Sequence, residues 1–192
     1  MTLNTKTVKG STSQLDIYLG HLRNDRAFAA LKKDGSVVTW GDSYYGGDSS
    51  SVRDELSSGV QKIFSNTYEF AALKNDGSVV TWGDWTKVDH VLNKHYLQFG
   101  NSVAPKSLLN RDIKTIYSND FAFAALKNDG SVVTWGSNLF GGNSQKYSIV
   151  SPYETKNIGS ARDNLLKDVD KIYPTYTGFV ALKKDGSIVS WG

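Results

Sequence analysis

The stretch Phe28-Ala-Ala-Leu-Lys-Lys-Asp-Gly-Ser-Val-Val-Thr-Trp-Gly41 decides how this chain folds, because close copies of it occur four times. The second copy, Phe70–Gly83, has Asn in place of the second lysine, and the third copy, Phe123–Gly136, is identical to the second. The fourth copy, Phe179–Gly192, differs from the first by conservative changes. Self-similarity of this kind indicates a repeat protein.

Each copy predicts a β-hairpin. Asp-Gly at its centre favours a two-residue type I′ turn, since both residues tolerate a left-handed backbone. The residues on either side, Phe-Ala-Ala-Leu and Ser-Val-Val-Thr-Trp, favour strands. A two-residue turn fixes the predicted cross-strand pairs, which are Lys33 with Ser36, Leu31 with Val38 and Ala29 with Trp40.

A further strand is predicted before three of the hairpins. The segments are Val60–Phe64, Ile113–Tyr117 and Val169–Tyr173, and they share apolar first and fourth positions and an aromatic fifth position. Before the first hairpin the corresponding segment matches this pattern poorly, and we place it at Leu15–Leu19 or around His21. Neither hairpin strand alternates cleanly between apolar and polar residues, so we expect both faces of each sheet to be covered.

Variable links follow the hairpins. Asp42–Asp48 and Ser137–Asn143 both contain an aromatic residue followed by Gly-Gly, which indicates a loop with special backbone angles. The second link, from Asp84 to Asn110, abandons this pattern. Short helical turns are predicted at Ser51–Leu56 and Ser160–Lys167.

Composition excludes several classes of protein. The chain has 192 residues, 22 Lys or Arg against 19 Asp or Glu, a net charge of +3 and no cysteine. Disulfides, thiolate zinc sites and thiol nucleophiles are therefore excluded. No apolar run reaches the ~20 residues of a membrane helix, and residues 1–13 show no secretory signal. The absence of cysteine fits either a bacterial cytoplasm or secretion.

We expect a single repeat domain over residues 1–192, with units at about 1–42, 60–84, 113–137 and 169–192. The core Ala-Leu-Lys-x-Asp-Gly-Ser-Val-Val-x-Trp-Gly, followed by an aromatic residue and Gly-Gly, resembles the regulator of chromosome condensation (RCC) repeat family. The bacterial branch typified by β-lactamase inhibitor protein II is the most similar. The resemblance implies an all-β fold, a β-propeller or part-propeller of units with three to four antiparallel strands, and a protein-binding function.

The sequence departs from the family pattern in two respects. The family commonly has Gly-Gly-x-His before the Ala-Leu pair, and here the histidine position holds Ala27, Glu69, Ala122 and Gly178. Four units also differ from the usual seven blades. The chain could be a fragment of a longer array, a four-bladed ring completed by residues 2–19, or half of a two-chain ring of eight units. A fragment or part-propeller that self-associates is favoured.

Two sets of repeated residues are expected to be structural. The tryptophans of the repeats predict packing between blades, with a sugar-stacking platform as the alternative; they are Trp40, Trp82, Trp135 and Trp191. The glycines of the turns predict positive φ angles; they are Gly35, Gly77, Gly130 and Gly186.

The links are the candidate binding surface, because repeat proteins keep their cores constant and vary their loops. Aromatic residues are favoured anchors of interfaces. The candidate contact residues are Tyr44, Tyr45, Trp85, His90, His95, Tyr96, Phe140, Tyr147 and Tyr153. The predicted partner is another protein, and replacing Trp85 or Tyr45 by alanine should weaken its capture without unfolding the chain. The alternatives are a glycan-binding propeller and a purely structural, self-assembling segment of a larger bacterial protein.

No enzyme, metal site or cofactor is predicted. His90 and His95 are five residues apart, which differs from the spacing of a helical zinc pair. Asp42 and Asp48 form the best carboxylate pair, whereas the aspartates of the four turns stand alone. Four lysines recur in register and could form a ring of positive charge or simply aid solubility; they are Lys32, Lys74, Lys127 and Lys183. Nucleic acid binding is not favoured, because no strong basic patch is present.

Overall fold

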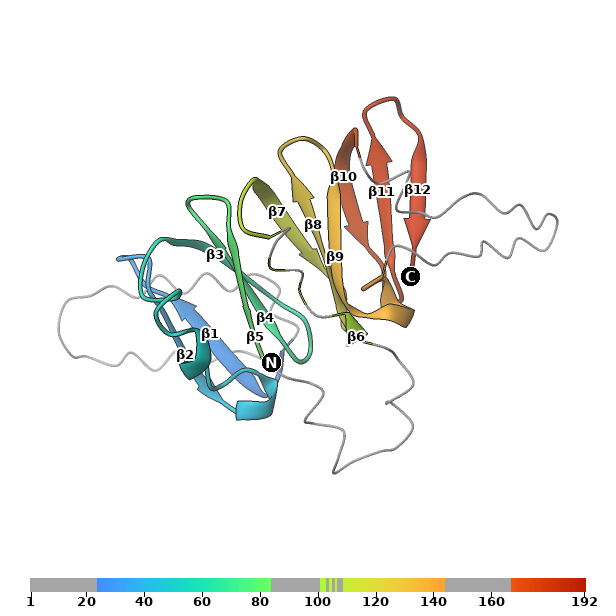
Figure 1. The fold of residues 1–192 in the computed structure, drawn as a ribbon. Helices are drawn as coiled ribbons and strands as arrows, with labels where there is room; N and C mark the ends of the chain where they lie inside the picture. Colours follow the sequence, from blue (N-terminus) through green and yellow to red (C-terminus); the bar gives the residue numbers. More distant parts are fainter. Residues whose placement is uncertain (1–23, 84–100, 103, 105, 107–108, 144–166) are drawn as a thin grey trace, which may run out of the picture.

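The computed structural model describes residues 24–83, 101–102, 104, 106, 109–143 and 167–192. Four antiparallel sheets stand side by side in an open row, in the order of the sequence (Figure 1). Unit 1 pairs β1 (Ala27–Leu31) with β2 (Val37–Gly41). Unit 2 contains β3 (Val60–Ser65), β4 (Phe70–Lys74) and β5 (Val79–Trp82).

Units 3 and 4 repeat this arrangement. Unit 3 contains β7 (Ile113–Ser118), β8 (Ala122–Lys127) and β9 (Val132–Ser137), and the short β6 (Asn101–Ser102) pairs with β9. Unit 4 contains β10 (Val169–Pro174), β11 (Phe179–Lys183) and β12 (Ile188–Trp191). The predicted all-β repeat architecture is confirmed, and so are the strands predicted before hairpins two, three and four. The strand predicted before the first hairpin lies outside the described residues.

The hairpin turns differ from the sequence prediction by one residue. Leu31 pairs with Val37 and Phe28 with Trp40, so the predicted pairs are wrong. The backbone N–H of Lys32 donates to the Ser36 carbonyl at 2.8 Å, which closes a three-residue loop.

The reason for this register is the backbone of the turn. In the described residues, only Asp112 and Asp168 combine a positive φ with a side chain, so the turn aspartates are not left-handed. A type I′ turn would need positive φ at both central residues, whereas here only the glycine has it, with φ of 78° at Gly35. This is the pattern of a type I turn followed by a glycine bulge.

Short 3-10 turns shape the links. η1 (Ser43–Tyr45) and η4 (Asn138–Phe140) occupy the same position after units 1 and 3, and each ends at a glycine with φ near 90°. The special backbone predicted for the Gly-Gly links is therefore confirmed. η2 (Ser50–Val52) begins the first segment predicted to be helical. The second such segment lies, except for its last residue, outside the described residues.

The hydrophobic core lies between the units. We call the side of a unit that meets the next unit along the chain its forward face, and the opposite side its backward face. Between units 1 and 2, the forward face supplies Ala27 and Ala29, and the backward face supplies Phe70, Ala72 and Trp82. Equivalent residues fill the contacts between units 2 and 3 and between units 3 and 4. Both faces of an interior sheet are therefore covered, as predicted.

A stacked Phe–Trp pair dominates each backward face. The ring centroids lie 5.0 to 5.3 Å apart in units 2 to 4, and these rings are almost completely buried. The indole N–H of Trp82 donates to the Gly46 carbonyl, and that of Trp191 to the Gly141 carbonyl, each at 3.1 Å. The predicted core role is thus confirmed for the last three repeat tryptophans. It is wrong for Trp40, which is 48% exposed, because no described unit covers its face.

Candidate functional site

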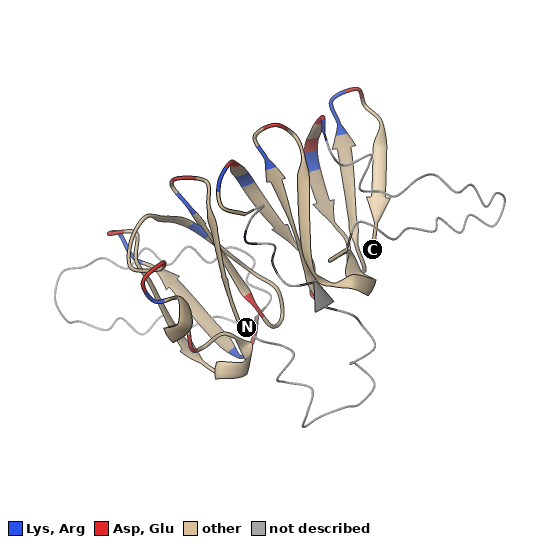
Figure 2. Ribbon diagram, viewed as in Figure 1, with Lys and Arg blue, Asp and Glu red and all other residues tan. Residues whose placement is uncertain are grey.

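The strands of the four units run between two chemically different sides of the molecule. We call the side with the four Asp-Gly turns (residues 32–36, 74–78, 127–131 and 183–187) the turn face. The opposite side, which we call the link face, carries η1, η4, the residues just before β1 (24–26) and the bends between the first and second strands of units 2 to 4 (residues 66–69, 119–121 and 175–178) (Figure 1). Charged residues gather at the turn face and are sparse at the link face (Figure 2).

Buried asparagines organise the bends of the link face. Asn24, Asn66 and Asn119 are almost fully buried at equivalent positions of units 1 to 3. The side-chain oxygen of Asn119 accepts hydrogen bonds from the backbone N–H of Phe121 and Ala122, and its amide donates to the Phe140 carbonyl at 2.7 Å. Asn24 holds the Tyr45 carbonyl in the same way. Asn24 and Asn119 therefore each fix both a bend and the link of their unit, which places the aromatic side chains there. Asn66 accepts hydrogen bonds from the backbone N–H of Tyr68 and Glu69 and so fixes its own bend.

These supports align five rings, which we call the aromatic row: Tyr45, Tyr68, Phe121, Phe140 and Tyr176. Tyr45 stacks on Tyr68 with centroids 5.4 Å apart, and Tyr68 lies 6.0 Å from Phe121. Phe121 in turn contacts Phe140 at 4.2 Å and the edge of Tyr176 at 6.4 Å. The row thus runs from the first link to the fourth unit without a break.

Exposed apolar side chains lie beside and at the end of this row. Tyr44 and Leu139, which occupy equivalent positions in η1 and η4, are about half exposed, and Tyr176 is 66% exposed. Tyr45, in contrast, is only 6% exposed. A row of contacting, mostly half-buried aromatic rings with exposed Tyr and Leu side chains beside it is typical of a surface that binds another protein.

The structure corrects the predicted set of contact residues. Tyr44 is exposed as expected, but Tyr45 is buried in the contact between units 1 and 2, and Phe140 packs against the contact between units 3 and 4. Replacing Tyr45 by alanine would therefore damage the core, contrary to the sequence prediction. The other predicted contact residues lie outside the described residues; these are Trp85, His90, His95, Tyr96, Tyr147 and Tyr153.

Sequence reasoning missed the bend aromatics Tyr68, Phe121 and Tyr176. A signal was present for the first two, since Tyr68 and Phe121 both stand two residues after a buried asparagine of the repeat. Leu139 was missed because a lone leucine in a loop carries no distinguishing pattern.

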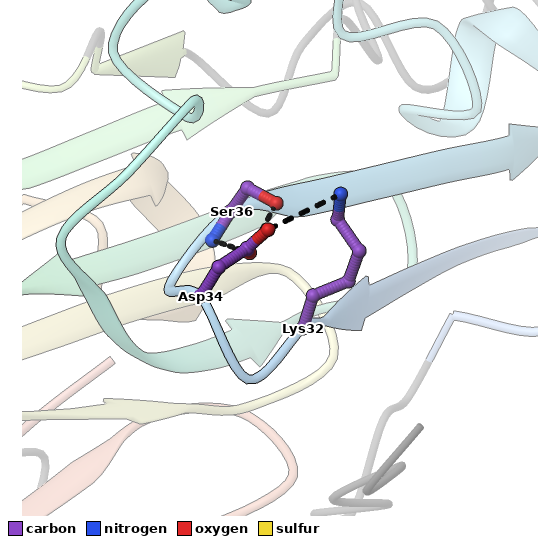
Figure 3. Close-up of polar contacts among 3 residues, drawn as sticks. All are labelled: Lys32, Asp34 and Ser36. Carbon is purple, nitrogen blue, oxygen red and sulfur yellow. Dashed lines mark hydrogen bonds and ion pairs between the residues drawn. The ribbon is translucent and has the colours of Figure 1, made fainter. Parts of the chain in front are cut away.

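The turn face repeats one local arrangement (Figure 3). A carboxylate oxygen of Asp34 accepts hydrogen bonds from the hydroxyl and the backbone N–H of Ser36, at 2.6 and 2.9 Å, and Lys32 lies 3.8 Å from the other oxygen. The serine bonds recur in all four turns. They hold the pKa of each turn aspartate below its ordinary value. Lysines and carboxylates therefore occur together here, and the turn face has mixed charge, which favours the solubility role of the repeated lysines over a ring of positive charge.

The best carboxylate pair predicted from the sequence serves the backbone. Asp42 accepts a hydrogen bond from the Tyr44 N–H and Asp48 from the Ser50 N–H, so each caps a turn. Within the ranges that the structure describes, no three His, Cys, Asp or Glu residues are grouped to hold a metal. All three histidines lie outside those ranges. No helix in them is long and apolar enough to cross a membrane.

An open hollow of about 550 Å³ lies beside β2, between this strand and residues 47–57. Its lining combines hydroxyl groups with the charged side chains of Lys32, Asp34, Asp48 and Arg53, and contains no aromatic ring. A sugar usually stacks on an aromatic ring, so this hollow does not favour glycan binding.

Comparison with known proteins identifies the fold. No protein-family model matches the chain, and no curated protein sequence is similar to it. Among solved structures, the chain is similar to yeast RCC1 (Prp20) bound to Kap60, with a TM-score of 0.54 and 18% identity over 88% of this chain and 42% of that chain. It is also similar to Prp20p from Saccharomyces cerevisiae, with a TM-score of 0.52 and 20% identity over 96% and 46%.

These similarities establish a part-propeller built from four RCC-type repeat units. The chain spans less than half the length of these two yeast structures. At this level of identity the comparison shows the fold, and the function must come from the surface of this chain itself.

Proposed function

We propose that this chain is a non-catalytic, protein-binding repeat module, one segment of a bacterial propeller protein, and that it binds its partner through the link face. The aromatic row is the observation that carries this function. Tyr44 and Leu139 precede two of its rings in η1 and η4, and Tyr176 is the ring at its end, so the row brings three exposed anchor side chains to one face.

Two further observations support protein binding. The yeast propeller similar to this chain was crystallised with Kap60, and the structure of Prp20p was described together with its binding to Gsp1p and histones. The repeated Asp-Gly-Ser-Val-Val-Thr-Trp-Gly motif supports placing the chain near the β-lactamase inhibitor protein II-like branch.

The test is a triple variant of the link face, in which Tyr44, Leu139 and Tyr176 are each replaced by alanine. All three side chains are at least half exposed, so we expect the fold to survive, as circular dichroism and thermal melting will show. Quantitative affinity capture from the host extract should recover a partner with the unmodified chain and lose it with the triple variant.

A matched control changes the turn face instead. Asn75, Asn128 and Lys184 are exposed at the second position of three turns, and their replacement by alanine should leave capture unchanged. If the triple variant of the link face captures the same proteins in the same amounts as the unmodified chain, this face is not the binding surface.

Glycan binding is the second candidate, because the exposed ring of Tyr176 could stack on a sugar. A glycan array separates the two functions. A lectin would give multivalent signals that one free sugar abolishes, whereas a protein-binding module would give none.

We also propose that the chain self-associates. Apolar side chains are exposed at both ends of the row of sheets, and a repeat array with open ends is stabilised when those ends are covered. A purely structural, self-assembling segment would show this property without partner binding at the link face.

A further inference from the structure

The two ends of the row expose opposite faces. Unit 1 exposes its backward face, where Phe28, Val38 and Trp40 are each 41–48% exposed. Unit 4 exposes its forward face, where Tyr173 and Ile188 are 51% and 68% exposed.

The equivalent residues of the backward face are buried in every other unit. Phe70, Phe123 and Phe179 correspond to Phe28, and all three are at most 1% exposed. The tryptophans of units 2 to 4 are buried with them, and each stacks on the phenylalanine of its own unit as Trp40 stacks on Phe28. The backward face of unit 1 thus carries the same Phe–Trp stack as the others, and no described unit packs against it.

The forward face of unit 4 shows the same relation. Phe64 and Tyr117 correspond to Tyr173, and they pack against units 3 and 4, respectively. The residues that correspond to Ile188 are valines, and they pack against the next unit in all three internal contacts; they are Val37, Val79 and Val132.

The backbone of the last turn is open as well. The carbonyl groups of Gly35, Gly77 and Gly130 accept hydrogen bonds from the first strand of the next unit, at 2.9 to 3.0 Å. In the part of the chain that the structure describes, no such donor meets Gly186, and no atom lies within 4 Å of a Cβ placed on it.

From this complementarity we propose that two copies of the chain associate head to tail, with the forward face of unit 4 of one copy against the backward face of unit 1 of the other. Tyr173 and Ile188 then lie against Phe28, Val38 and Trp40. The equivalents of Ile188 already make this contact three times within the described residues, and those of Tyr173 make it twice. A second copy fits because one molecule carries both halves of this contact. Such a contact joins two different surfaces, so it closes into a ring or continues as a chain of copies. This geometry rests on the proposed self-association and is independent of partner binding at the link face.

The experiment measures the solution mass of the full 192-residue chain by light scattering and sedimentation over a range of concentrations. Three variants are compared with the unmodified chain: Trp40→Lys on the backward face, Ile188→Lys on the forward face, and Leu139→Lys on the link face as the matched control. All three positions are about half exposed or more, and thermal melting will show that each variant remains folded.

We expect the unmodified chain and Leu139→Lys to exceed the 21.1 kDa of one chain. Trp40→Lys and Ile188→Lys should each remain monomeric, with an association weakened roughly tenfold or more. An equimolar mixture of these two variants should form a 1:1 dimer and stop there, since each retains the face that the other has lost.

Three results would overturn the head-to-tail contact. If the unmodified chain is monomeric at all concentrations, the proposal of self-association is wrong. Assembly that survives both lysine substitutions places the contact elsewhere and leaves self-association standing. Assembly lost in only one of the two variants indicates that two identical faces pair symmetrically. Partner capture by the link face is read separately, from the Leu139 variant.

Discussion

Trp40 and Trp191 stand at the same position of the repeat, one in the first unit and one in the last, and their environments are opposite. Trp191 is the penultimate residue of the chain and is 1% exposed, whereas Trp40 is 48% exposed. Both stack on a phenylalanine of their own unit at similar distances, 5.3 and 5.5 Å. Unit 3 covers the backward face of unit 4, whereas no described unit precedes unit 1.

The comparison shows that the burial of a repeat tryptophan depends on whether another unit packs against the backward face of its own unit. A unit makes its own hairpin and its own Phe–Trp stack, but it cannot bury that stack. Burial requires the forward face of the preceding unit and its link, which supplies the carbonyl acceptor of the indole N–H. Stability in such an array is carried largely by contacts between neighbouring units.

The largest expected effect comes from removing these tryptophans. Trp82→Ala and Trp191→Ala should each lower the free energy of unfolding by about 3–5 kcal/mol, because a buried ring and a hydrogen bond are lost. Trp40→Ala should cost less than about 1.5 kcal/mol, since its ring is already half in water. Urea unfolding of dilute protein measures all three. If Trp40→Ala and Trp191→Ala lowered the free energy of unfolding equally, the contribution of each tryptophan to stability would come from its stack within the unit and not from the unit that covers it.

The turn glycines give a smaller and better matched comparison. Gly130 and Gly186 have φ angles of 83° and 84°, so replacement by alanine imposes the same backbone strain of about 1–2 kcal/mol at both. A Cβ at Gly130 would also lie 2.9 Å from the backbone nitrogen of Asp168 in the next unit, whereas Gly186 has open space. We therefore expect Gly130→Ala to be the more destabilising by about 1–3 kcal/mol.

Thermal melting of the two glycine variants is the measurement. If the two variants melted at the same temperature, the destabilisation would come from the backbone strain of the turn alone, and the contact with the following unit would contribute nothing.

The smallest expected effect concerns the turn aspartates, whose pKa values should be similar in unit 3 and unit 4. The Ser131 and Ser187 hydrogen bonds hold the pKa of Asp129 and Asp185 below the ordinary value. A lowered carboxyl pKa in the folded state stabilises the protein above the unfolded pKa of about 3.9, and this contribution is lost as the pH falls through the folded value. NMR titration should therefore find both pKa values lowered to a similar extent.

Ser131→Ala and Ser187→Ala remove the hydroxyl donor and should raise the pKa of the neighbouring aspartate toward its ordinary value. Stability measured between pH 5 and 3 should then fall less steeply in each variant. A difference between the two turns would mean that the following unit, which only the turn at Asp129 contacts, also influences the carboxyl group.

Much of the fold was predictable because its determinants are local. Each unit has its Asp-Gly-Ser turn and its β-branched second strand within a few residues of one another, and three units have a further strand just before the hairpin, so repetition revealed four similar units. The one-residue error in the hairpin register arose because Asp-Gly suits both a two-residue and a three-residue turn. The hydrogen bonds between Asp34 and Ser36 accompany the second form.

The candidate site was predictable only in part. The sequence placed aromatic residues in the links, but it assigned Tyr45 to the surface, although this ring is clamped between units 1 and 2. The aromatic row joins residues from two links and three bends, and no spacing in the sequence reports that Phe121 lies between Phe140, Tyr68 and Tyr176.

The sequence by itself determined the hairpins, the number of units and the all-β class, since each depends on interactions within a single repeat. Only the tertiary structure decided which copies of a repeated residue are buried. The segments Val-Val-Thr-Trp-Gly41 and Ile-Val-Ser-Trp-Gly192 are nearly the same, yet their tryptophans differ from half exposed to fully buried. Burial depends on the neighbour that covers a face, and that neighbour comes from a distant part of the chain.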